Sequence, residues 1–384
     1  MIKRDYLIEH VRSGLQEAPV VALLGARQSG KTTLARQLIA EWTEDVHYFD
    51  MEVAADRMAM RNPEQVLEGL KGLVVIDEVQ AVPHLFTALR PLSDRTPLPA
   101  RFCLLGSASP EIIKGFSESL AGRIHFVPVT GLTLDEVGVS RQNELWLRGG
   151  FPRSFLPPSE RASLIWRRNF IRTHVERDIP SLGIQVSADV LHRFWSMLAH
   201  YHGQIWNAEE LGRSLGVTGK TVRHYLNILS GTYLVRVLPP WFENAGKRIV
   251  KSPKIYFRDS GLLHAFLGAE SMEGLWGNPK YGASWEGFAM EQILARTNVF
   301  QPYFWATQHG AELDLFLEHN GHRIGIEFKC ADAPEITKSM RIALEDLKLD
   351  QILVVYPGNR TYPLDKNVHV MPLSQAIARL ASKT

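Results

Sequence analysis

The stretch Val20-Val-Ala-Leu-Leu24-Gly25-Ala-Arg-Gln-Ser-Gly30-Lys31-Thr32 decides how the first third of the chain folds. Its first five residues form a continuous apolar run, which is typical of a parallel strand buried on both faces. The remainder matches the pattern GxxxxGK[ST], and apolar residues at helical spacing continue from Leu34 to Glu41. The pattern therefore has the strand–loop–helix context that a phosphate-binding loop requires.

The residue types of this loop suit the chemistry of phosphate binding. Gly25 and Gly30 let the backbone curl until its N–H groups face phosphate oxygens, and the N-terminus of the next helix adds positive potential. Lys31 is expected to reach the β- and γ-phosphates, and Thr32 to offer its hydroxyl to Mg²⁺. The predicted ligand is therefore Mg-ATP. The loop residues expected to contact it are Gly25, Ala26, Arg27, Gln28, Ser29, Gly30, Lys31, Thr32 and Thr33.

Two acidic residues, Asp77 and Glu78, follow the apolar run Leu73–Ile76. Open α/β sheets bind ligands at the carboxyl ends of their strands, which is where both acids fall. Asp77 is expected to hold the Mg²⁺ shell, and Glu78 to orient and deprotonate the attacking water. A third apolar run, Phe102–Leu105, leads to Ser107, which either senses the γ-phosphate or only caps a helix.

Arg123 is the last candidate in the first third of the chain. It is either an arginine finger, acting in cis or from a neighbouring subunit, or a solvated surface residue. A finger that acts between subunits would make the protein a homo-oligomer. The segments His47–Asp50 and Ile124–Val129 are expected to add strands to the same sheet.

Composition sets the broad class of protein. The 384 residues are 45% apolar and 22% charged, which is ordinary for a soluble globular chain of several domains. The 43 Lys and Arg nearly balance the 41 Asp and Glu, so the net charge of +2 indicates no partner by itself. No apolar run reaches the ~18 residues of a membrane span, and the N-terminus lacks the apolar core of a signal peptide. Two cysteines cannot form a disulfide framework, so we expect a reducing cytoplasm.

The middle of the chain is basic and predicts a helical lid followed by a helix-turn-helix. The helical pattern of Leu164–Asp178 contains several arginines and favours a lid behind the ATP-binding core. A first helix over Glu209–Leu215 and a second from about Thr218 are expected, with wing strands at Leu234–Leu238 and Lys254–Phe257. The second helix either enters a major groove or serves only for packing. The residues that it would present to nucleic acid are Lys220, Thr221 and Arg223.

The last third predicts a mixed α/β domain. A helix is expected over Gly282–Thr297, and Asn320-Gly321 is a signal for a tight turn between two strands. Glu327 and Lys329 are two residues apart on the second strand, so they project from the same face. The turn brings the strand that carries Asp314 alongside them.

This D…E-x-K arrangement resembles the core of restriction-endonuclease-like folds. Such cores often take a further acid from the preceding helix, where Glu286 lies. The resemblance implies Mg²⁺ held by Glu286, Asp314 and Glu327, with Lys329 stabilising developing charge or activating water. The alternatives are a surface salt-bridge cluster and a nuclease-like fold that has lost cleavage.

The segments GARQSGKTT, LVVIDEVQ, LLGSAS and SLAGR, together with Leu147–Pro152, resemble a known family. They are similar to the AAA-type prokaryotic ATPases that carry a C-terminal domain of unknown function, DUF4143. The resemblance extends over nearly the whole chain and implies ATP binding and hydrolysis. It names no biological process.

The whole sequence predicts an α/β protein of four parts. These are a P-loop AAA-type parallel-sheet domain over 1–140, a helical lid over 141–200, a winged helix-turn-helix over 201–260 and an α/β restriction-endonuclease-like domain over 261–384. The favoured function is an ATP-driven machine associated with nucleic acid, DNA being the expected partner. The alternative is an ATP-dependent signalling or defence switch whose C-terminal domain binds a protein partner without cutting nucleic acid.

Overall fold

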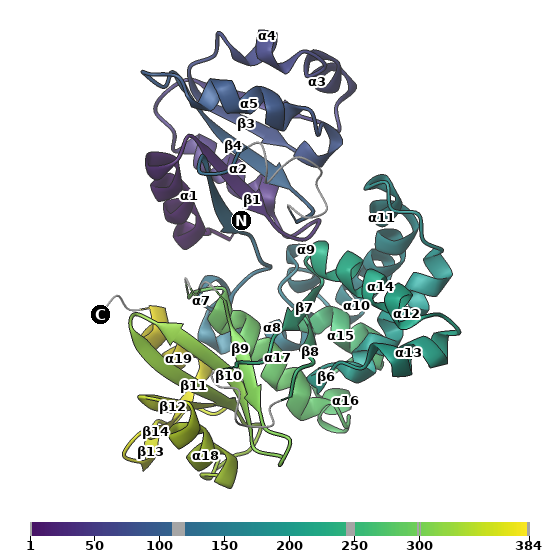
Figure 1. The fold of residues 1–384 in the computed structure, drawn as a ribbon, viewed down its shortest axis with the longest axis vertical. Coiled ribbons are helices and arrows are strands. Elements are labelled where there is room, and N and C mark those ends of the chain that lie inside the picture. Colours follow the sequence, from purple (N-terminus) through teal and green to yellow (C-terminus); the bar gives the residue numbers. More distant parts are fainter. Residues whose placement is uncertain (1, 110–119, 243–249, 298, 300, 382–384) are drawn as a thin grey trace. The chain divides into compact units, whose positions relative to one another are not determined.

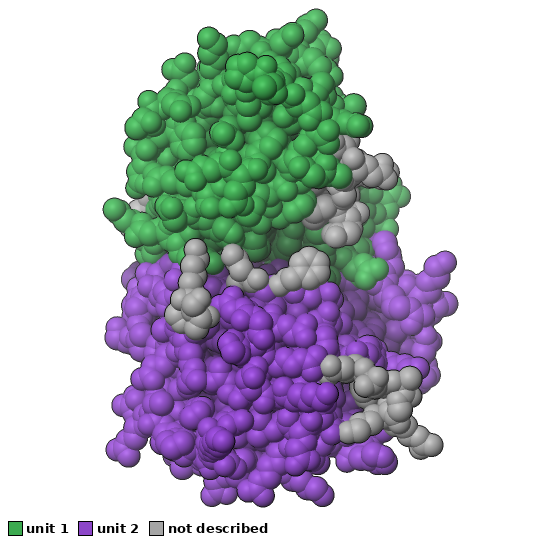
Figure 2. Space-filling model, turned by 60° about the vertical axis from the view of Figure 1, so that its left-hand side comes forward, with its two compact units in different colours: residues 1–132, 176–185, 227–234 green, residues 133–175, 186–226, 235–384 purple. Residues whose placement is uncertain are grey.

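The computed structural model describes residues 2–109, 120–242, 250–297, 299 and 301–381. They form two compact units, drawn as a ribbon in Figure 1 and coloured separately in Figure 2. Unit 1 comprises residues 1–132, 176–185 and 227–234, and unit 2 comprises residues 133–175, 186–226 and 235–384. Within the described part of the chain, no helix has the length and apolar character needed to span a membrane.

Unit 1 is built on a five-stranded sheet in the order β2-β3-β4-β1-β5, and every neighbouring pair is parallel. The predicted parallel sheet is therefore confirmed. All five residues of the central strand β1 are buried, as its continuous apolar run requires. The strands are β1 (Val20–Leu24), β2 (Val46–Asp50), β3 (Gly72–Asp77), β4 (Ala100–Gly106) and β5 (Ile124–Pro128).

Helices cover both faces of this sheet (Figure 1). Helices α1 (Asp5–Glu17) and α2 (Lys31–Ala40) share one apolar core with Val21 and Leu23 of β1. Helices α4 (Pro63–Leu67) and α5 (Leu85–Ser93) share the other core with Val20, Ala22 and Leu24. The alternation along β1 thus fixes the sheet between two helical layers. In the described part of unit 1, the other short helices are α3 (Ala54–Ala59), η1 (Val79–Ala81) and α11 (Ile179–Ser181).

The carboxyl ends of β1, β3 and β4 meet at one edge of the sheet because the strands are parallel. Leu24 is in register with Gly106, and Ile76 is in register with Leu104. Gly25 and Asp77 therefore lie at this edge. Arg123 precedes β5, and its carbonyl accepts a hydrogen bond from the N–H of Val20 at 3.2 Å, at the opposite edge.

Unit 2 begins with a group of helices. The predicted helix at 164–178 starts earlier, at Glu160, and ends in a π-helical turn over His174–Asp178. The helices of this part are α7 (Leu134–Val137), η2 (Val139–Arg141), α8 (Gln142–Arg148), α9 (Pro152–Phe155), α10 (Glu160–Thr173), α12 (Ala188–Tyr201), α15 (Ser260–Leu267) and α16 (Met272–Trp276).

The two helices expected as a helix-turn-helix are α13 (Ala208–Leu215) and α14 (Gly219–Gly231). Asn207 caps α13 by accepting a hydrogen bond from Glu210 N at 3.2 Å, and Gly216 ends it with φ of 71°. Both are standard helix-boundary signals, which is why this turn could be read from the sequence. A small antiparallel sheet accompanies these helices: β6 (Gln204–Ile205), β8 (Lys254–Phe257) and β7 (Val235–Leu238), in that order.

The C-terminal part of unit 2 is a mixed six-stranded sheet in the order β13-β14-β12-β11-β10-β9. The β10–β11 hairpin is antiparallel, whereas β12 runs parallel to β11 and to β14. The strands are β9 (Tyr303–Ala306), β10 (Glu312–His319), β11 (His322–Phe328), β12 (Gln351–Tyr356), β13 (Tyr362–Asp365) and β14 (Val368–Pro372). Three helices accompany them: α17 (Tyr281–Leu294), α18 (Lys338–Asp346) and α19 (Leu373–Ala381).

Candidate nucleotide site and carboxylate cluster

The glycines of the loop between β1 and α2 are required by its shape. A Cβ atom on Gly25 would lie 2.0 Å from the backbone oxygen of Val129, so no larger residue fits there. Gly30 has φ of 98° and Gln28 has φ of 64°, both in the region that costs an L-residue energy. The loop is therefore curled tightly around the start of α2.

Lys31 lies inside this curl and is 4% exposed. Its ammonium donates hydrogen bonds of 2.9 Å to the carbonyl oxygens of Gly25 and Ala26. Burial lowers the pKa of Lys31 to about 8, against the opposing effect of Glu78 and Asp77. A buried ammonium held by neutral carbonyl groups is suited to bind an anionic phosphate.

Ser29 also fits a nucleotide ligand. It is 1% exposed, and its hydroxyl oxygen has no hydrogen-bond partner among the described residues. A buried hydroxyl without a partner is costly, and a phosphate oxygen in the loop would satisfy it. The loop therefore holds both the charge and the donors that a nucleotide phosphate needs.

Asp77 is the centre of a hydrogen-bond network at the end of β3. Its Oδ2 accepts hydrogen bonds from the hydroxyls of Thr32 at 2.7 Å and Tyr48 at 2.9 Å, and its Oδ1 accepts from Glu78 N at 2.9 Å. Burial and the neighbouring Asp77 raise the pKa of Tyr48, so its hydroxyl keeps its proton and remains a donor. Thr32 and Asp77, the two predicted Mg²⁺ residues of this site, are thus in direct contact.

Glu78 lies next to Ser107, as the position of both residues beyond the strand ends suggests. The Ser107 hydroxyl donates to Glu78 Oε1 at 3.3 Å. The Gln80 amide donates to Glu78 Oε2 and in turn accepts a hydrogen bond of 3.3 Å from Ser107 N. Burial raises the pKa of Glu78 although Lys31 opposes the shift. Glu78 also has φ of 55°, a strained conformation that is frequent at functional sites.

Arg27 is tied to acidic side chains. Its guanidinium forms ion pairs of 2.6 Å with Asp178 and 2.5 Å with Glu52. Asp178 belongs to the segment 176–185 that returns to unit 1, so this contact joins residues 151 positions apart. Arg4 joins the loop to the chain after β5, since its guanidinium donates to Ser29 O at 3.2 Å and to Gly131 O at 2.9 Å.

Three supporting residues, Arg4, Tyr48 and Gln80, were missed by the sequence reasoning. Gln80 lies two residues after Glu78, and that spacing was the available signal. Arg4 and Tyr48 carry no motif, and only the fold brings them to the site.

Arg123 does not join the nucleotide loop within one chain. It lies at the opposite edge of the sheet and pairs with Asp94 through contacts of 2.6 and 2.9 Å. This pair raises the pKa of Arg123 and lowers that of Asp94. Of the alternatives for Arg123, this position speaks against a finger in cis, because β5 runs parallel to β1 and starts at the far edge; a finger from a neighbouring subunit and a surface residue stay predictions.

The carboxylate cluster of unit 2 forms where α17, β8, β10 and β11 come together. The register of the hairpin pairs Leu315 with Ile326, so one residue further Asp314 faces Glu327. Asp314 Oδ2 accepts a hydrogen bond from Phe328 N at 2.9 Å, and Lys329 donates to Glu327 Oε1 at 2.7 Å. Glu286 and Asp314 both contact Lys254, and Glu327, opposite Asp314 in the hairpin, contacts Lys329. These contacts bring together the four predicted residues: Glu286, Asp314, Glu327 and Lys329.

Lys254 of β8 occupies the middle of this cluster. It is 3% exposed, and its ammonium contacts Glu286 at 3.3 Å, Asp314 at 3.7 Å and Glu312. Burial opposes its charge, but the surrounding carboxylates, Glu286 foremost, hold the pKa of Lys254 well above its usual range. Lys254 is therefore a buried cation in the position where the sequence suggested a metal ion.

The predicted Mg²⁺ ligand set of Glu286, Asp314 and Glu327 is not formed. Among the described residues, no three His, Cys, Asp or Glu side chains are placed to hold a metal ion. The physical reason is that the Lys254 ammonium already neutralises Glu286 and Asp314. Glu327 turns to Lys329 instead, and its Oε2 is buried without a hydrogen-bond partner among the residues that the structure describes.

Protons supply the rest of the charge balance in the cluster. Burial, with Asp314 as the next cause, raises the pKa of Glu286 to about 7 and that of Glu327 to about 8. Tyr256 donates its hydroxyl to Glu286 and further satisfies this carboxylate. Near neutral pH the cluster therefore holds both a buried lysine and partly protonated carboxyl groups.

The predicted nucleic-acid residues lie in the first turns of α14. Lys220 and Arg223 are exposed, and Thr221 is half-buried. Arg223 makes one weak surface contact of 3.5 Å with Glu209, and the Thr221 hydroxyl is 3.0 Å from that of Thr218. Two cationic side chains are thus accessible on this helix, while Thr221 takes part in the cap at its start.

Comparison with known proteins places the chain in a family. A model described as an AAA domain matches residues 17–138, and a domain of unknown function, DUF4143, matches residues 281–376. Another domain of unknown function, DUF8612, matches residues 140–273. The chain belongs to the AAA-type P-loop ATPases that carry a C-terminal DUF4143 domain.

The similar proteins include two uncharacterised mycobacterial proteins, Rv2008c of Mycobacterium tuberculosis and Mb2031c of Mycobacterium bovis. Each is 47% identical over 377 residues, covering 98% of this chain and 85% of the relative. Among solved structures, the Walker-type ATPase PABY2304 of Pyrococcus abyssi is 15% identical, with a TM-score of 0.49 over 69% of this chain and 96% of that one. The RuvB Holliday junction branch migration motor of Thermotoga maritima is 19% identical, with a TM-score of 0.31 over 62% of this chain and 90% of that one.

Proposed function

We propose that this protein binds and hydrolyses Mg-ATP at the β1–α2 loop and acts together with nucleic acid. The observation that carries the ATPase proposal is the contact of Thr32 with Asp77 beside a buried Lys31. A hydroxyl and a carboxylate in contact are the two protein groups that hold Mg²⁺ in P-loop enzymes. Thr32 and Asp77 would hold Mg²⁺, which would supply positive charge to the phosphates of the nucleotide.

Each residue of the nucleotide site would have a separate role. The curled loop and Lys31 would bind the phosphates, and Thr32 with Asp77 would hold the Mg²⁺ shell. Glu78 would orient the attacking water and accept its proton, which its raised pKa favours. Ser107 would sense the γ-phosphate, and its hydrogen bond to Glu78 supports this role.

Nucleic-acid association is the second part of the proposal. It rests on α13 and α14, which we take as part of a winged helix-turn-helix over 201–260. The residues that precede it in the sequence, 141–200, we take as a helical lid. Between His200 and Ser260 the sequence has nine Lys and Arg against four Asp and Glu. The exposed Lys220 and Arg223 lie on the second helix, and the surface contact of Arg223 with Glu209 costs little to release.

A second candidate function is favoured by Lys254. We take the domain over 261–384 as nuclease-like in fold, with its carboxylates paired to a lysine in place of a metal ion. Metal-dependent cutting needs those carboxylates free. The second candidate function is therefore an ATP-dependent signalling or defence switch. In this switch the C-terminal domain binds a protein partner and does not cut nucleic acid. Any role of Arg123 at phosphate would have to be in a homo-oligomer.

ATP hydrolysis measured with and without duplex DNA tests the proposal. We expect Mg²⁺-dependent hydrolysis that DNA stimulates, and its loss in Glu78→Gln with ATP binding retained. Glu68→Gln, an exposed acid of the same unit, is the matched control and should leave the rate unchanged. Hydrolysis that ignores DNA would favour the switch, and hydrolysis that survives Glu78→Gln would show that another group activates the water.

A further inference from the structure

We infer that Asp178 is a positioning residue for the nucleotide loop, and that its ion pair with Arg27 links nucleotide binding to the docking of the segment 176–185 on unit 1. The inference rests on the proposed function and adds a means of regulating the same site. Arg27 belongs to the loop itself, whereas Asp178 lies 151 positions further along the chain.

The side chain of Arg27 is held by carboxylates from outside the loop. Its Nη1 contacts Asp178 Oδ1 at 2.6 Å, and its Nη2 contacts Glu52 Oε1 at 2.5 Å. Phosphate-binding loops use their backbone N–H groups, so this side chain can serve to fix the loop. The neighbouring Gln28 has φ of 64°, a conformation that persists only where surrounding contacts support it. The two ion pairs therefore support the loop next to a strained residue.

The two carboxylates differ in exposure. The side chain of Asp178 is 11% exposed, and that of Glu52 is 56% exposed. Water and salt screen an exposed ion pair, whereas a partly buried pair is screened much less. We therefore expect the pair of Arg27 with Asp178 to contribute more to the shape of the loop than the pair of Arg27 with Glu52.

The segment 176–185 is anchored in unit 1 by apolar packing as well as by this ion pair. Leu182 packs against the core that contains Leu24, the last residue of β1 before the loop. The stretches that flank the segment in the sequence, 133–175 and 186–226, both belong to unit 2. A firmer hold on the segment therefore acts on a stretch that is covalently joined to unit 2 at both ends.

The charge of Arg27 also acts on two other residues of the site. Burial lowers the pKa of Lys31 against the effect of nearby acids, and the charge of Arg27 adds to this lowering. Burial raises the pKa of Glu78, which Lys31 and, to a smaller extent, Arg27 oppose. Asp178 therefore fixes the position of a charge to which both residues respond.

Coupling between two binding events is reciprocal. If Asp178 holds the loop in its binding shape, bound nucleotide must stabilise the docked segment by the same factor. The inference can thus be tested from both sides: by the nucleotide affinity of variants of the pair, and by the protection of the segment when nucleotide binds.

The affinity is measured by isothermal titration of Mg-ATP into the full chain. The variants are Asp178→Asn, Arg27→Gln, the two combined, and Asp178→Glu, which keeps the carboxylate. Asp189→Asn, the same change at an exposed aspartate of α12, is the matched control. We expect Asp178→Asn to weaken binding about fivefold or more, and Asp178→Glu to recover part of the loss, while the control binds normally. In the Arg27→Gln background, Asp178→Asn should have no further effect because the pair is already broken.

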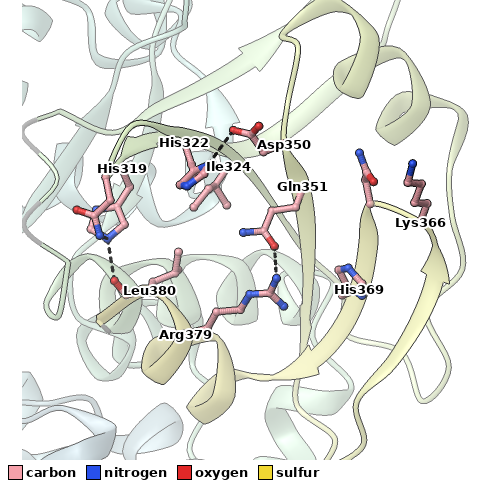
Figure 3. A pocket seen from close by; sticks show the side chains of 11 residues that line it. His319, His322, Ile324, Asp350, Gln351, Lys366, His369, Arg379 and Leu380 are labelled. Atoms are coloured by element: carbon pink, nitrogen blue, oxygen red, sulfur yellow. Dashed lines mark hydrogen bonds and ion pairs between the residues drawn. The ribbon is translucent and has the colours of Figure 1, made fainter. Parts of the chain in front are cut away.

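The docking of the segment is measured by hydrogen exchange of peptides that cover 176–185, with and without saturating Mg-ATP. We expect nucleotide to slow this exchange in the unsubstituted chain and to slow it less in Arg27→Gln. The strands around the pocket in Figure 3 provide a reference within unit 2. They are joined by contacts of their own, such as the 3.4 Å between His322 Nδ1 and Asp350 Oδ2, so their exchange should not change.

The outcomes separate this inference from the proposed function. Mg-ATP binding that is equal in Asp178→Asn and in the unsubstituted chain would overturn the inference alone. Tighter binding in Asp178→Asn would also overturn it, because the carboxylate would then only repel the nucleotide. Additive losses in the double variant, or exchange of 176–185 that nucleotide does not slow, would show that the ion pair does not link the two. An unsubstituted chain that does not bind Mg-ATP would overturn the proposed function as well.

Discussion

Replacing Lys254 by methionine should destabilise unit 2 in a pH-dependent way. Methionine is about as long as the aliphatic part of lysine, but it lacks the ammonium that contacts Glu286 at 3.3 Å and Asp314 at 3.7 Å. Breaking a buried ion pair by removing one partner costs ~3–5 kcal/mol, because the other charge is left unpaired. That full cost applies only while Glu286 is ionised.

The pKa of Glu286 sets where the cost appears. It is raised to about 7 even with Lys254 present, and loss of the lysine charge raises it further. At pH 6 Glu286 therefore takes up a proton in the variant, and the cost falls to the ~1 kcal/mol of the lost hydrogen bonds. At pH 8.5 the variant must either keep the unpaired charge or protonate Glu286 about 1.5 pH units above its pKa with Lys254 present, which costs ~2 kcal/mol in addition to the ~1 kcal/mol of the hydrogen bonds. A loss of ~3 kcal/mol lowers the melting temperature by about 10 °C for a unit of this size.

Tryptophan fluorescence during thermal unfolding reports mainly on unit 2. Of the chain's nine tryptophans, Trp42 lies in unit 1 and the others lie in unit 2. Lys251→Met, an exposed lysine three residues before Lys254, is the matched control and should not change the melting temperature at either pH. An equal loss at pH 6 and pH 8.5, or a loss below ~1 kcal/mol at pH 8.5, would refute the role given to Lys254.

Three further predictions concern the carboxylate cluster and helix α14. Mn²⁺ should raise the melting temperature of Lys254→Met but not of the unsubstituted protein, because removal of the lysine frees carboxylates for a cation; equal shifts would contradict this. Glu327, whose pKa is raised to about 8, stabilises the fold below its unfolded pKa and loses that contribution as the pH rises to 8. Glu327→Gln should therefore be neutral at pH 5 and stabilising at pH 8.5, as chemical denaturation would show, and the same effect at both values would be the contrary result. Lys220→Ala with Arg223→Ala should make the salt dependence of DNA binding shallower by about 2 in logarithmic slope, and an unchanged slope would move the contact elsewhere.

Much of unit 1 could be predicted because its signals are local. The strand β1, the glycines and Lys31 lie within a dozen consecutive residues, and the acids of β3 follow another apolar run. The contact of Arg27 with Asp178 could not be found this way, because it depends on a distant segment that returns to unit 1. The alternatives for Arg123 stayed open for a related reason: the sequence does not reveal at which edge of the sheet a residue beside β5 lies.

In unit 2 the hairpin of β10 and β11 was readable from Asn320-Gly321 and the spacing of Glu327 and Lys329. The role of Lys254 was not, because in the sequence it resembles an ordinary basic residue of a wing strand. Its partners Glu286 and Asp314 come from other elements, and only the packing of β8 against them buries the ammonium. Strand β13 was missed since Tyr362–Asp365 contains a proline and has no buried face.

We expect the β1–α2 loop to bind Mg-ATP through Lys31. Isothermal titration of Mg-ATP into the intact chain, compared with Lys31→Ala, tests it most directly. Lys71→Ala, an exposed lysine of the same unit, serves as the control. We predict that the unsubstituted chain and the control bind Mg-ATP alike, and that Lys31→Ala loses a charge-assisted contact of a few kcal/mol, weakening binding at least about thirtyfold. Equal affinity of Lys31→Ala and the unsubstituted chain would show that the β1–α2 loop does not bind the nucleotide through Lys31.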